Sequence, residues 1–391
     1  MIVGGGIAGL TMAKHFLEKK ESVTLLEWYP KVGGRIATYR DDTIEYEMGA
    51  KRIHVSHHRI LALLKRYKIQ TAPMSNEKYF HNDKNVFSEL IQPIMRVVQS
   101  LDVRVLQQHT IGELLPLEFH PILTMFPYYA EIHTLRADLA IPLFLEKGPM
   151  VGQEFLAVLG GLDQLITKLS DGVTILARHR VEDIVSLSGG GFELIGNYGK
   201  KKDALPFRIQ CRRLVLATEY RSFGRFSLLH RFEFMKYLTD SPLIRIYARY
   251  PIHSETGKVW FHDRMATVVD SPIRFFAPIQ KQLGLILISY TDGGDTEVWK
   301  NLEGDKLVGR IQKELRLLFP DLHIPDPFFL KKHSWIQGCT YWKKGNYSLE
   351  DMVKQAHNPM KDLYICGESV NPHQSWMESA LESAERVQSL L

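Results

Sequence analysis

The first residues of the chain could bind a phosphate group. Gly4-Gly5-Gly6-Ile7-Ala8-Gly9 fits the pattern G-x-G-x-x-G after only three residues. In this pattern Gly4 permits a tight turn, Gly6 lets backbone N–H groups reach a pyrophosphate, and Gly9 allows a helix to pack closely on a strand. The helix expected after the turn points its N-terminus, where Ile7 and Ala8 lie, at the anion. The turn is therefore a candidate dinucleotide-binding site.

An acidic residue and a Gly-Gly-Arg stretch follow this turn. The strand-like run at 22–27 ends in Glu27, whose carboxylate is spaced to bond a ribose 2′-hydroxyl and would repel the 2′-phosphate of NADP. Gly33 and Gly34 permit another close approach of backbone to ligand, and Arg35 carries a fork of N–H donors suited to phosphate. Taken alone, this stretch could also be a turn with a surface arginine.

Together, the glycine-rich turn, the acidic strand end and the Gly-Gly-Arg stretch resemble the start of the flavin amine oxidase superfamily. That superfamily includes monoamine and polyamine oxidases, L-amino-acid oxidases, phytoene desaturases and protoporphyrinogen oxidases. The resemblance implies that the bound dinucleotide is FAD.

The end of the chain is similar to the closing segment of the same family. The segment "LYICGESVNPHQSWMESALESAERV" begins at Leu363. The resemblance implies that Gly367 and Glu368 contact the ribityl–phosphate part of FAD and that Met377 lies near the isoalloxazine carbonyls. From the residues alone, Ser375 and Glu378 have capping-box spacing at a helix start. A plain surface helix is the alternative interpretation.

The middle of the chain resembles the family as well. Residues 160–184 read as a helix that ends at Gly172, followed by a strand. The resemblance implies that the backbone of Val181 contacts the adenine. Residues 212–218 resemble the strand that precedes the second excursion into a substrate domain.

The stretch at 47–70 bears on the reaction. The resemblance implies that Gly49 and Ala50 pack at the flavin. Arg52 follows as in the Gly-x-x-Arg stretch of L-amino-acid oxidases, in which the arginine binds the substrate carboxylate. A planar guanidinium can make two parallel charge-assisted hydrogen bonds to a carboxylate. The alternative is that Arg52 pairs with a FAD phosphate or a nearby acidic residue.

Two aromatic residues are candidates for the walls of an amine pocket. The run "SWMES" is closer to the L-amino-acid oxidases than to the monoamine oxidases, which places Trp376 at the pocket, with a buried core position as the alternative. "HSWIQGCTYWKKG" resembles the strand of the other wall, for which Tyr341 is the candidate. Cys339, near the position of covalent flavin attachment in monoamine oxidases, is interpreted as a small apolar strand residue.

One residue departs from the family pattern. Most of these oxidases have a lysine beneath the flavin, and the matching position in the strand-like run 241–251 is Arg245. Arginine stays protonated in proteins, so it could orient a water molecule but could not accept a proton. His54, His57 and His58 do not form a convincing metal-ligand pattern, and no metal is expected.

Composition limits the class of protein. With 391 residues the chain exceeds the usual size of one domain. Three cysteines and no signal-peptide pattern lead us to expect a cytoplasmic protein. No apolar run reaches the about 18 residues that span a membrane. The net charge of +5 is scattered, so no nucleic-acid partner is expected.

We therefore predict an α/β fold in two discontinuous domains. A Rossmann-like FAD-binding domain would comprise 1–74, 152–234 and 352–391, and a mixed-sheet α+β substrate domain 75–151 and 235–351. The predicted function is FAD-dependent oxidation of an amine, preferentially an α-amino acid, by hydride transfer to flavin N5, with O2 reduced to H2O2.

The sequence leaves alternatives open. A desaturase or protoporphyrinogen oxidase could use the apolar runs "FPYYAEI" and "LAIPLFL" to line an entrance for a large substrate. A sugar mutase and a FAD-holding scaffold without amine chemistry are the others. The oligomeric state and any covalent attachment of the flavin stay undetermined.

Overall fold

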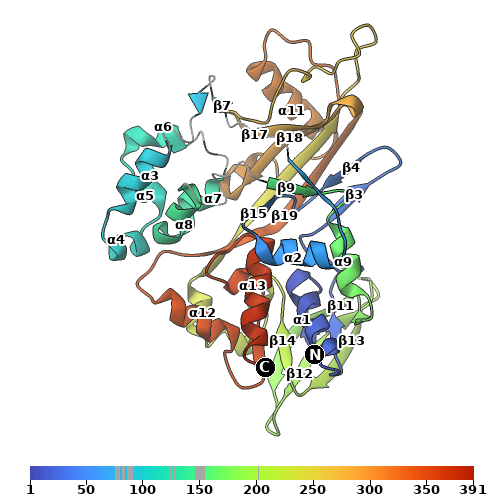
Figure 1. Cartoon of the computed structure of the whole chain (residues 1–391), viewed down its shortest axis with the longest axis vertical. Coiled ribbons are helices and arrows are strands. Elements are labelled where there is room, and N and C mark those ends of the chain that lie inside the picture. The colour runs from blue at the N-terminus through green and yellow to red at the C-terminus, as the bar shows by residue number, and fades with distance from the viewer. Residues whose placement is uncertain are drawn as a thin grey trace.

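The computed structural model describes residues 1–74, 80–81, 84–85, 91–123, 126, 128–145, 155–200 and 202–391. The predicted domain boundary at 151–152 lies outside these ranges. In Figure 1 a parallel sheet with its helices occupies the lower half, long antiparallel strands rise above it, and a group of helices lies to one side. No helix of the described ranges has both the length and the apolar character that crossing a membrane requires.

The lower half is built on a five-stranded parallel sheet. Its strand order is β10-β2-β1-β14-β20, and all neighbouring strands run parallel. The strands are β10 (Thr174–Leu176), β2 (Thr24–Leu26), β1 (Ile2–Val3), β14 (Leu214–Leu216) and β20 (Leu363–Ile365). Three stretches that are far apart in the sequence thus form one sheet, and the fold has the predicted α/β class.

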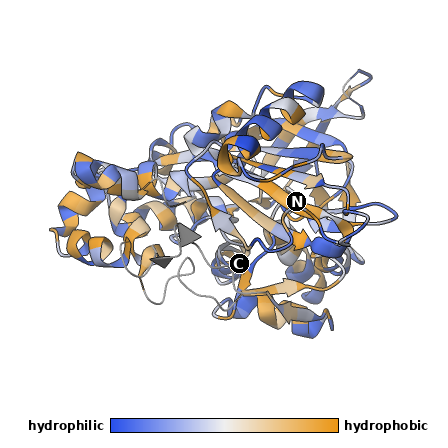
Figure 2. Cartoon of the chain, turned by 90° about the horizontal axis from the view of Figure 1, so that it is seen from above, coloured by the Kyte–Doolittle hydropathy of each residue, from blue (hydrophilic) through white to orange (hydrophobic). Residues whose placement is uncertain are grey.

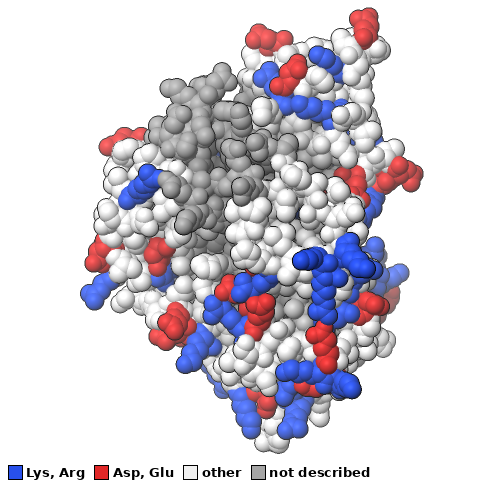
Figure 3. All heavy atoms as spheres, in the orientation of Figure 1, with Lys and Arg blue, Asp and Glu red and all other residues white. Residues whose placement is uncertain are grey.

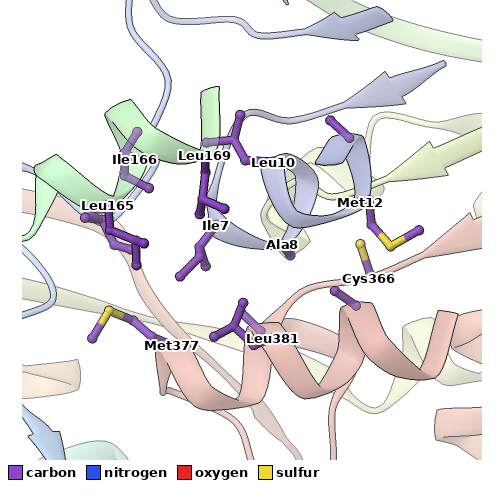
Figure 4. Close-up of a cluster of buried hydrophobic side chains, with 14 of the residues drawn as sticks. Ile7, Ala8, Leu10, Met12, Leu165, Ile166, Leu169, Cys366, Met377 and Leu381 are labelled. Atoms are coloured by element: carbon purple, nitrogen blue, oxygen red, sulfur yellow. The ribbon is translucent and has the colours of Figure 1, made fainter. Parts of the chain in front are cut away.

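Alternate residues of each strand enter different cores, because side chains of a strand point to opposite faces. Ile2, Leu25 and Val215 face a core formed with α1 (Ile7–Glu18), α9 (Asp163–Ser170) and α13 (Met377–Gln388). Figure 4 shows side chains of these three helices meeting in that core. On the other face, Val3 and Leu26 pack with the antiparallel sheet β11 (His179–Ser186), β12 (Phe192–Tyr198) and β13 (Leu205–Cys211), and with α12 (Leu349–His357).

The upper half contains a second, antiparallel sheet. Its order is β16-β17-β18-β15-β19. The strands are β16 (Thr267–Val268), β17 (Phe275–Gln280), β18 (Leu285–Asp292), β15 (Leu238–Arg249) and β19 (Phe329–Trp342). Leu238 pairs with Trp342 in the lower core, whereas Ala248 pairs with Leu330 beside α11 (Gly304–Leu318). The two longest strands therefore connect the halves.

The helices at the side form a core of their own, into which Tyr341 of β19 also packs. They are α3 (Gln92–Gln99), α4 (Val103–Gln108), α5 (Ile111–Leu114), η2 (Leu117–Phe119), α6 (His120–Leu123), α7 (Tyr129–His133) and α8 (Ala137–Phe144). Figure 2 shows hydrophobic and hydrophilic residues alternating along them, as expected for helices with one buried face.

Short elements link the two halves. A hairpin is formed by β3 (Thr38–Arg40) and β4 (Glu45–Glu47), and a small sheet has the order β5-β9-β6. Its strands are β5 (Ile53–His54), β9 (Phe155–Val158) and β6 (Thr71–Pro73), and α2 (His58–Arg66) follows β5. The remaining short elements are β7 (Phe80–His81), β8 (Lys84–Asn85), α10 (Tyr220–Phe223), η3 (Ser227–Leu229), η4 (Glu233–Lys236), η5 (Lys281–Leu283), η6 (Gly293–Val298) and η7 (Glu368–Val370).

The predicted capping box at Ser375 and Glu378 is wrong. Helix α13 begins at Met377 after Trp376, and Ser375 has a φ of 75° in the left-handed region. The Glu378 carboxylate instead accepts hydrogen bonds of 3.0 Å from the backbone N–H groups of Arg59 and Ile60, at the start of α2. A tertiary contact between two helices thus replaces the local cap.

Charged side chains of both signs share the surface. On the face shown in Figure 3, Lys and Arg gather over the lower half and Asp and Glu lie among them. The bidentate ion pair of Arg40 with Asp163, with both N···O distances below 3 Å, ties the β3–β4 hairpin to α9.

Candidate functional site

Of the four glycines in the glycine-rich turn, Gly4, Gly5 and Gly9 have no space for a side chain, whereas Gly6 does. Gly4 has a φ of 106°, and a Cβ there would lie 2.4 Å from the carbonyl oxygen of Ala217. A Cβ on Gly9 would lie 2.0 Å from the carbonyl oxygen of Gly4, so the helix can approach this closely only without a side chain. A Cβ on Gly6 would meet no atom within 4 Å. The backbone at Gly6, the N-cap of the 12-residue α1, therefore borders open space.

The Gly-Gly-Arg stretch lies directly against this turn. The backbone N–H of Gly33 donates a 2.8 Å hydrogen bond to the carbonyl oxygen of Gly5. A Cβ on Gly34, which has a φ of 58°, would meet only the Cα of Gly6 at 3.5 Å. The two glycine-rich backbones therefore lie in direct contact, and Gly6 and Gly33 form a parallel β-bridge.

Arg35 joins this turn to the C-terminal segment. Its Nη1 donates 2.7 Å to Glu368 Oε1 and 3.1 Å to the carbonyl oxygen of Gly338. Burial alone would lower the pKa of Arg35, but its interactions with Glu368, Cys339 and Glu219 together raise the pKa. Gly367 has a φ of 134°, and a Cβ there would meet nothing within 4 Å although the residue is buried. The phosphate contact predicted for Arg35 stays a prediction.

Glu27 is held by the backbone at the end of β2. Its two carboxylate oxygens accept 2.8 Å hydrogen bonds from the N–H groups of Gly5 and Tyr29. Burial raises the pKa of Glu27, and these two hydrogen bonds oppose the shift. Val181 is buried on β11 where the pairing with β12 shifts register. The ribose and adenine contacts of these residues stay predictions.

Gly49 and Ala50 are fixed against the Gly-Gly-Arg stretch. The N–H of Ala50 donates 2.9 Å to the carbonyl oxygen of Arg35. A Cβ on Gly49 would lie 2.0 Å from that oxygen and 3.1 Å from the Trp335 ring. Met377, for which we predict a flavin contact, lies in the core shown in Figure 4.

Arg52 and Trp376 both contact the aromatic ring of Phe155. The guanidinium carbon of Arg52 is 5.0 Å from the ring centroid of Phe155, and Arg52 Nη2 donates to the hydroxyl of Tyr128. The same Phe155 ring stacks on Trp376 at 6.4 Å with an interplanar angle of 9°. Trp376 Nε1 is buried and has no hydrogen-bond partner within the described ranges. An arginine and an indole N–H therefore flank one apolar surface.

Arg245 reaches the same neighbourhood through other rings. The guanidinium carbon of Arg245 lies 5.5 Å from the Tyr290 centroid, which lies 5.8 Å from that of Tyr128. Arg245 Nη1 also donates 3.4 Å to the carbonyl oxygen of Glu47. Shared rings thus bring Arg52, Trp376 and Arg245 together, and Tyr341 packs in the same core cluster as Trp376.

Several residues of this neighbourhood are not predicted from the sequence. Tyr341 donates a 3.0 Å hydrogen bond from its hydroxyl to Glu131 Oε1. Glu131 belongs to "FPYYAEI", and the only available signal is an acidic residue inside an apolar run. The other residues that the sequence analysis misses are Tyr128, Phe155, Tyr290 and Asp292.

Cys339 and His57, which we considered for flavin attachment and metal binding, are both side chains whose pKa is shifted by burial. Burial raises the pKa of the Cys339 thiol to about 12, so this side chain of β19 is a neutral thiol. His57 Nδ1 lies 3.2 Å from the backbone nitrogen of His54, and burial lowers the pKa of His57 to about 4. Within the described ranges, no three His, Cys, Asp or Glu residues are grouped to hold a metal ion.

Comparisons with known proteins agree with this architecture. A family model described as flavin-containing amine oxidoreductase matches residues 7–140 and 125–387. Amine oxidase A from Bos taurus is 32% identical over 107 residues, which cover 26% of this chain and 20% of that protein. L-amino-acid oxidase from Mus musculus is 37% identical over 92 residues, which cover 23% of this chain and 14% of that protein. The matched region spans no more than a fifth of either relative.

Solved structures match over nearly the whole chain. Cyclohexylamine oxidase from Brevibacterium oxydans superposes with a TM-score of 0.76 at 16% identity, covering 100% of this chain and 97% of that one. A putrescine oxidase variant superposes with a TM-score of 0.78 at 15% identity, covering 99% and 97%. At such identities the likeness shows a shared fold.

Proposed function

Because the chain belongs to the flavin-containing amine oxidoreductase family, we propose that it oxidises an amine, preferentially an α-amino acid, with O2 as the electron acceptor. The observation that carries the amino-acid assignment is the position of Arg52, which shares the Phe155 ring with Trp376. An arginine in an aromatic setting can hold a carboxylate while the apolar walls receive the rest of the substrate.

The residues present fit the family's cofactor, FAD. The open positions at Gly6 and Gly367 lie on backbone that a dinucleotide can approach, and the start of α1 favours its phosphates. Glu27 is assigned to the ribose and the Val181 backbone to the adenine. When bound, the flavin supplies the site that accepts a hydride from the carbon beside the amine nitrogen.

The protein's own side chains bind and orient the substrate. Arg52 anchors the carboxylate through two parallel hydrogen bonds, and this fixes the direction in which the amine points. Trp376 and Tyr341 form the walls of the amine pocket. Arg245, held over the Tyr290 ring, orients a water molecule but does not exchange a proton.

We assign these roles to two discontinuous domains. The FAD-binding domain comprises 1–74, 152–234 and 352–391, and the substrate domain comprises 75–151 and 235–351. The substrate site lies where β15 and β19 pass between them. Three unpaired cysteines are compatible with a cytoplasmic enzyme.

Anaerobic mixing tests the function. The yellow holoprotein is mixed with α-amino acids and with the amines obtained by their decarboxylation, and the visible flavin absorbance is followed. We expect bleaching by amino acids and not by the matched amines. Arg52→Ala should reduce the bleaching rate by at least about 100-fold, since a charged, hydrogen-bonded contact is lost.

Arg66→Ala is the matched control, because Arg66 is an exposed arginine that pairs with Glu18 on the surface. It should bleach like the wild type. If dithionite reduces the flavin but no amine or amino acid does, the proposed function is wrong. Desaturation of a large apolar substrate, mutase chemistry or a scaffold role would then explain the fold better.

A further inference from the structure

Two buried carboxyl groups lie beside the predicted substrate residues. Glu131 on α7 is 3% exposed, and Asp292 at the end of β18 is 4% exposed. Both oxygens of Asp292 accept backbone hydrogen bonds, at 2.7 Å from Tyr129 and 3.4 Å from Ala130. Asp292 is thereby occupied as the cap of α7.

Glu131 has one oxygen in use and one without a partner. Its Oε1 accepts the 3.0 Å hydrogen bond from the Tyr341 hydroxyl. Its Oε2 is buried and has no hydrogen-bond partner within the described ranges. A buried carboxylate oxygen without a donor is costly, and such groups call for a functional explanation.

The surroundings of Glu131 set its charge. Burial raises the pKa of Glu131 to about 7, and the nearby positive charge of Arg52 lowers it. Burial and the charge of Glu131 raise the pKa of Asp292 well above its usual value. The other titratable groups that face the pair are Tyr341 and Cys339 on β19, Tyr290 on β18 and Asp295 on η6. Glu131 can therefore change its protonation state near neutral pH.

We propose that Glu131 Oε2 accepts a proton from the ammonium group of the bound substrate. This inference rests on the proposed function, in which Arg52 holds the carboxylate of the same molecule. An N–H bond of the ammonium breaks, its electron pair stays on nitrogen, and an O–H bond forms at Oε2. The products are a neutral amine, the form from which hydride can leave the adjacent carbon, and an uncharged Glu131.

No other described group close to Arg52 serves as well. The Tyr341 hydroxyl already donates to Glu131, and burial raises its pKa well above the usual value of tyrosine. His57 has a pKa lowered by burial to about 4, which makes it a poor proton acceptor at neutral pH. The guanidinium groups of Arg52 and Arg245 carry hydrogen-bond donors and no acceptor.

The first test is the pH dependence of anaerobic flavin reduction by an amino acid. In the wild type the rate of flavin reduction should rise with pH, and this rising limb of the pH–rate profile should be centred near pH 7. Glu131→Gln should lose this limb and reduce the rate about 100-fold at pH 7, the size typical of a proton-transfer residue. Its rate should recover towards that of the wild type at a pH where the free amine is already neutral.

Glu47→Gln is the matched control. Burial raises the pKa of Glu47 to about 7 as well, but its carboxylate accepts hydrogen bonds from the backbone N–H of Leu162 and the hydroxyl of Thr38. It should keep the limb near pH 7. Tyr341→Phe provides a second probe, since the Tyr341 hydrogen bond lowers the pKa of Glu131. This variant should shift the limb upward by up to about one pH unit.

Binding gives a readout that needs no turnover. The amino acid 2-aminoisobutyrate has no C–H bond on its α-carbon, so its affinity can be titrated through the visible spectrum of the flavin. Its dissociation constant should rise as the pH falls below 7 in the wild type and should be flat over this range in Glu131→Gln.

The outcomes separate this inference from the proposed function. If the wild type oxidises amino acids and Glu131→Gln has the same pH profile, or is slowed equally at every pH, the role of Glu131 is wrong and the function stands. If Glu131→Gln does not fold, the limb measured in Tyr341→Phe decides, and an unshifted limb rejects the proposal. If no amine reduces the wild-type flavin, the function itself fails.

Discussion

At the scale of single residues, burial sets how His357 responds to pH. His357 Nδ1 lies 2.7 Å from the Val353 carbonyl oxygen, Nε2 lies 2.9 Å from Ser383 Oγ, and burial lowers the pKa to about 4. In the unfolded chain a histidine protonates below about pH 6.5. The unfolded state therefore binds more protons between about pH 6.5 and 4, and the free energy of unfolding falls as the pH falls through this window.

His357→Gln should therefore lose less free energy of unfolding than the wild type between pH 7 and pH 4. The difference should be at most about 3 kcal/mol. Urea unfolding at a series of pH values measures it. His373→Gln, the same substitution at an exposed position, is the control. An equal slope in wild type and His357→Gln would contradict the assignment.

The sequence predicts some site residues well and others not at all. Gly4 and Gly9 are predicted because a tight turn and a close helix contact require glycine whatever surrounds them. Arg52 is assigned from the resemblance of its Gly-x-x-Arg stretch to the L-amino-acid oxidases, and its substrate contact stays a prediction. Glu131 is not predicted from the sequence. Its interest lies in the hydrogen bond from Tyr341 and in the unpartnered Oε2, and both depend on tertiary structure rather than on a local sequence pattern.

At the scale of elements, the glycine-rich turn separates a folding role from a binding role. A Cβ on Gly9 would press on backbone at 2.0 Å, whereas a Cβ on Gly6 would enter open space, and the φ of Gly6 is −74°. Gly9→Ala should therefore lower the free energy of unfolding of the apoprotein by about 1–3 kcal/mol. Gly6→Ala should change it by less than about 1 kcal/mol but weaken FAD binding at least about 10-fold.

Urea unfolding of the apoproteins and FAD titration measure the two effects separately. If Gly6→Ala binds FAD as tightly as the wild type, the phosphates do not lie at Gly6. If the free energy of unfolding of the Gly9→Ala apoprotein is unchanged, α1 can move away from the turn.

The sequence predicts elements best where they are locally periodic. The helix α9 and the strand at 174–176 follow from an apolar pattern and a glycine stop, whereas the strand at 214–216 is expected from the family resemblance of residues 212–218. The cap of α13 is not predicted correctly, since Glu378 meets α2 instead of its own helix. The helices between 91 and 145 match the family loosely in sequence, and their arrangement depends on packing against β19.

At the scale of the whole molecule, chain segments far apart in the sequence meet at the glycine-rich turns to which we assign FAD. The turns at Gly6 and Gly34 and the bend at Gly367 come from the first and last parts of the chain, and the Arg35–Glu368 ion pair joins them. A ligand that contacts all three holds these segments together and stabilises the folded state according to its concentration and affinity.

Removal of FAD should therefore lower the Tm and loosen these segments selectively. With FAD present at about 100 times its Kd, the stabilisation lost is about 2.7 kcal/mol. Hydrogen exchange comparing holoprotein and apoprotein should show faster exchange at 4–10, 33–36 and 366–377, and little change in β17 and β18. These strands serve as the internal control, because their core with α11 contains none of the three glycine positions. Two outcomes would contradict this prediction. Equally faster exchange throughout the chain would mean that FAD stabilises the molecule as one cooperative unit. Faster exchange confined to β17 and β18 would place the cofactor in the other half.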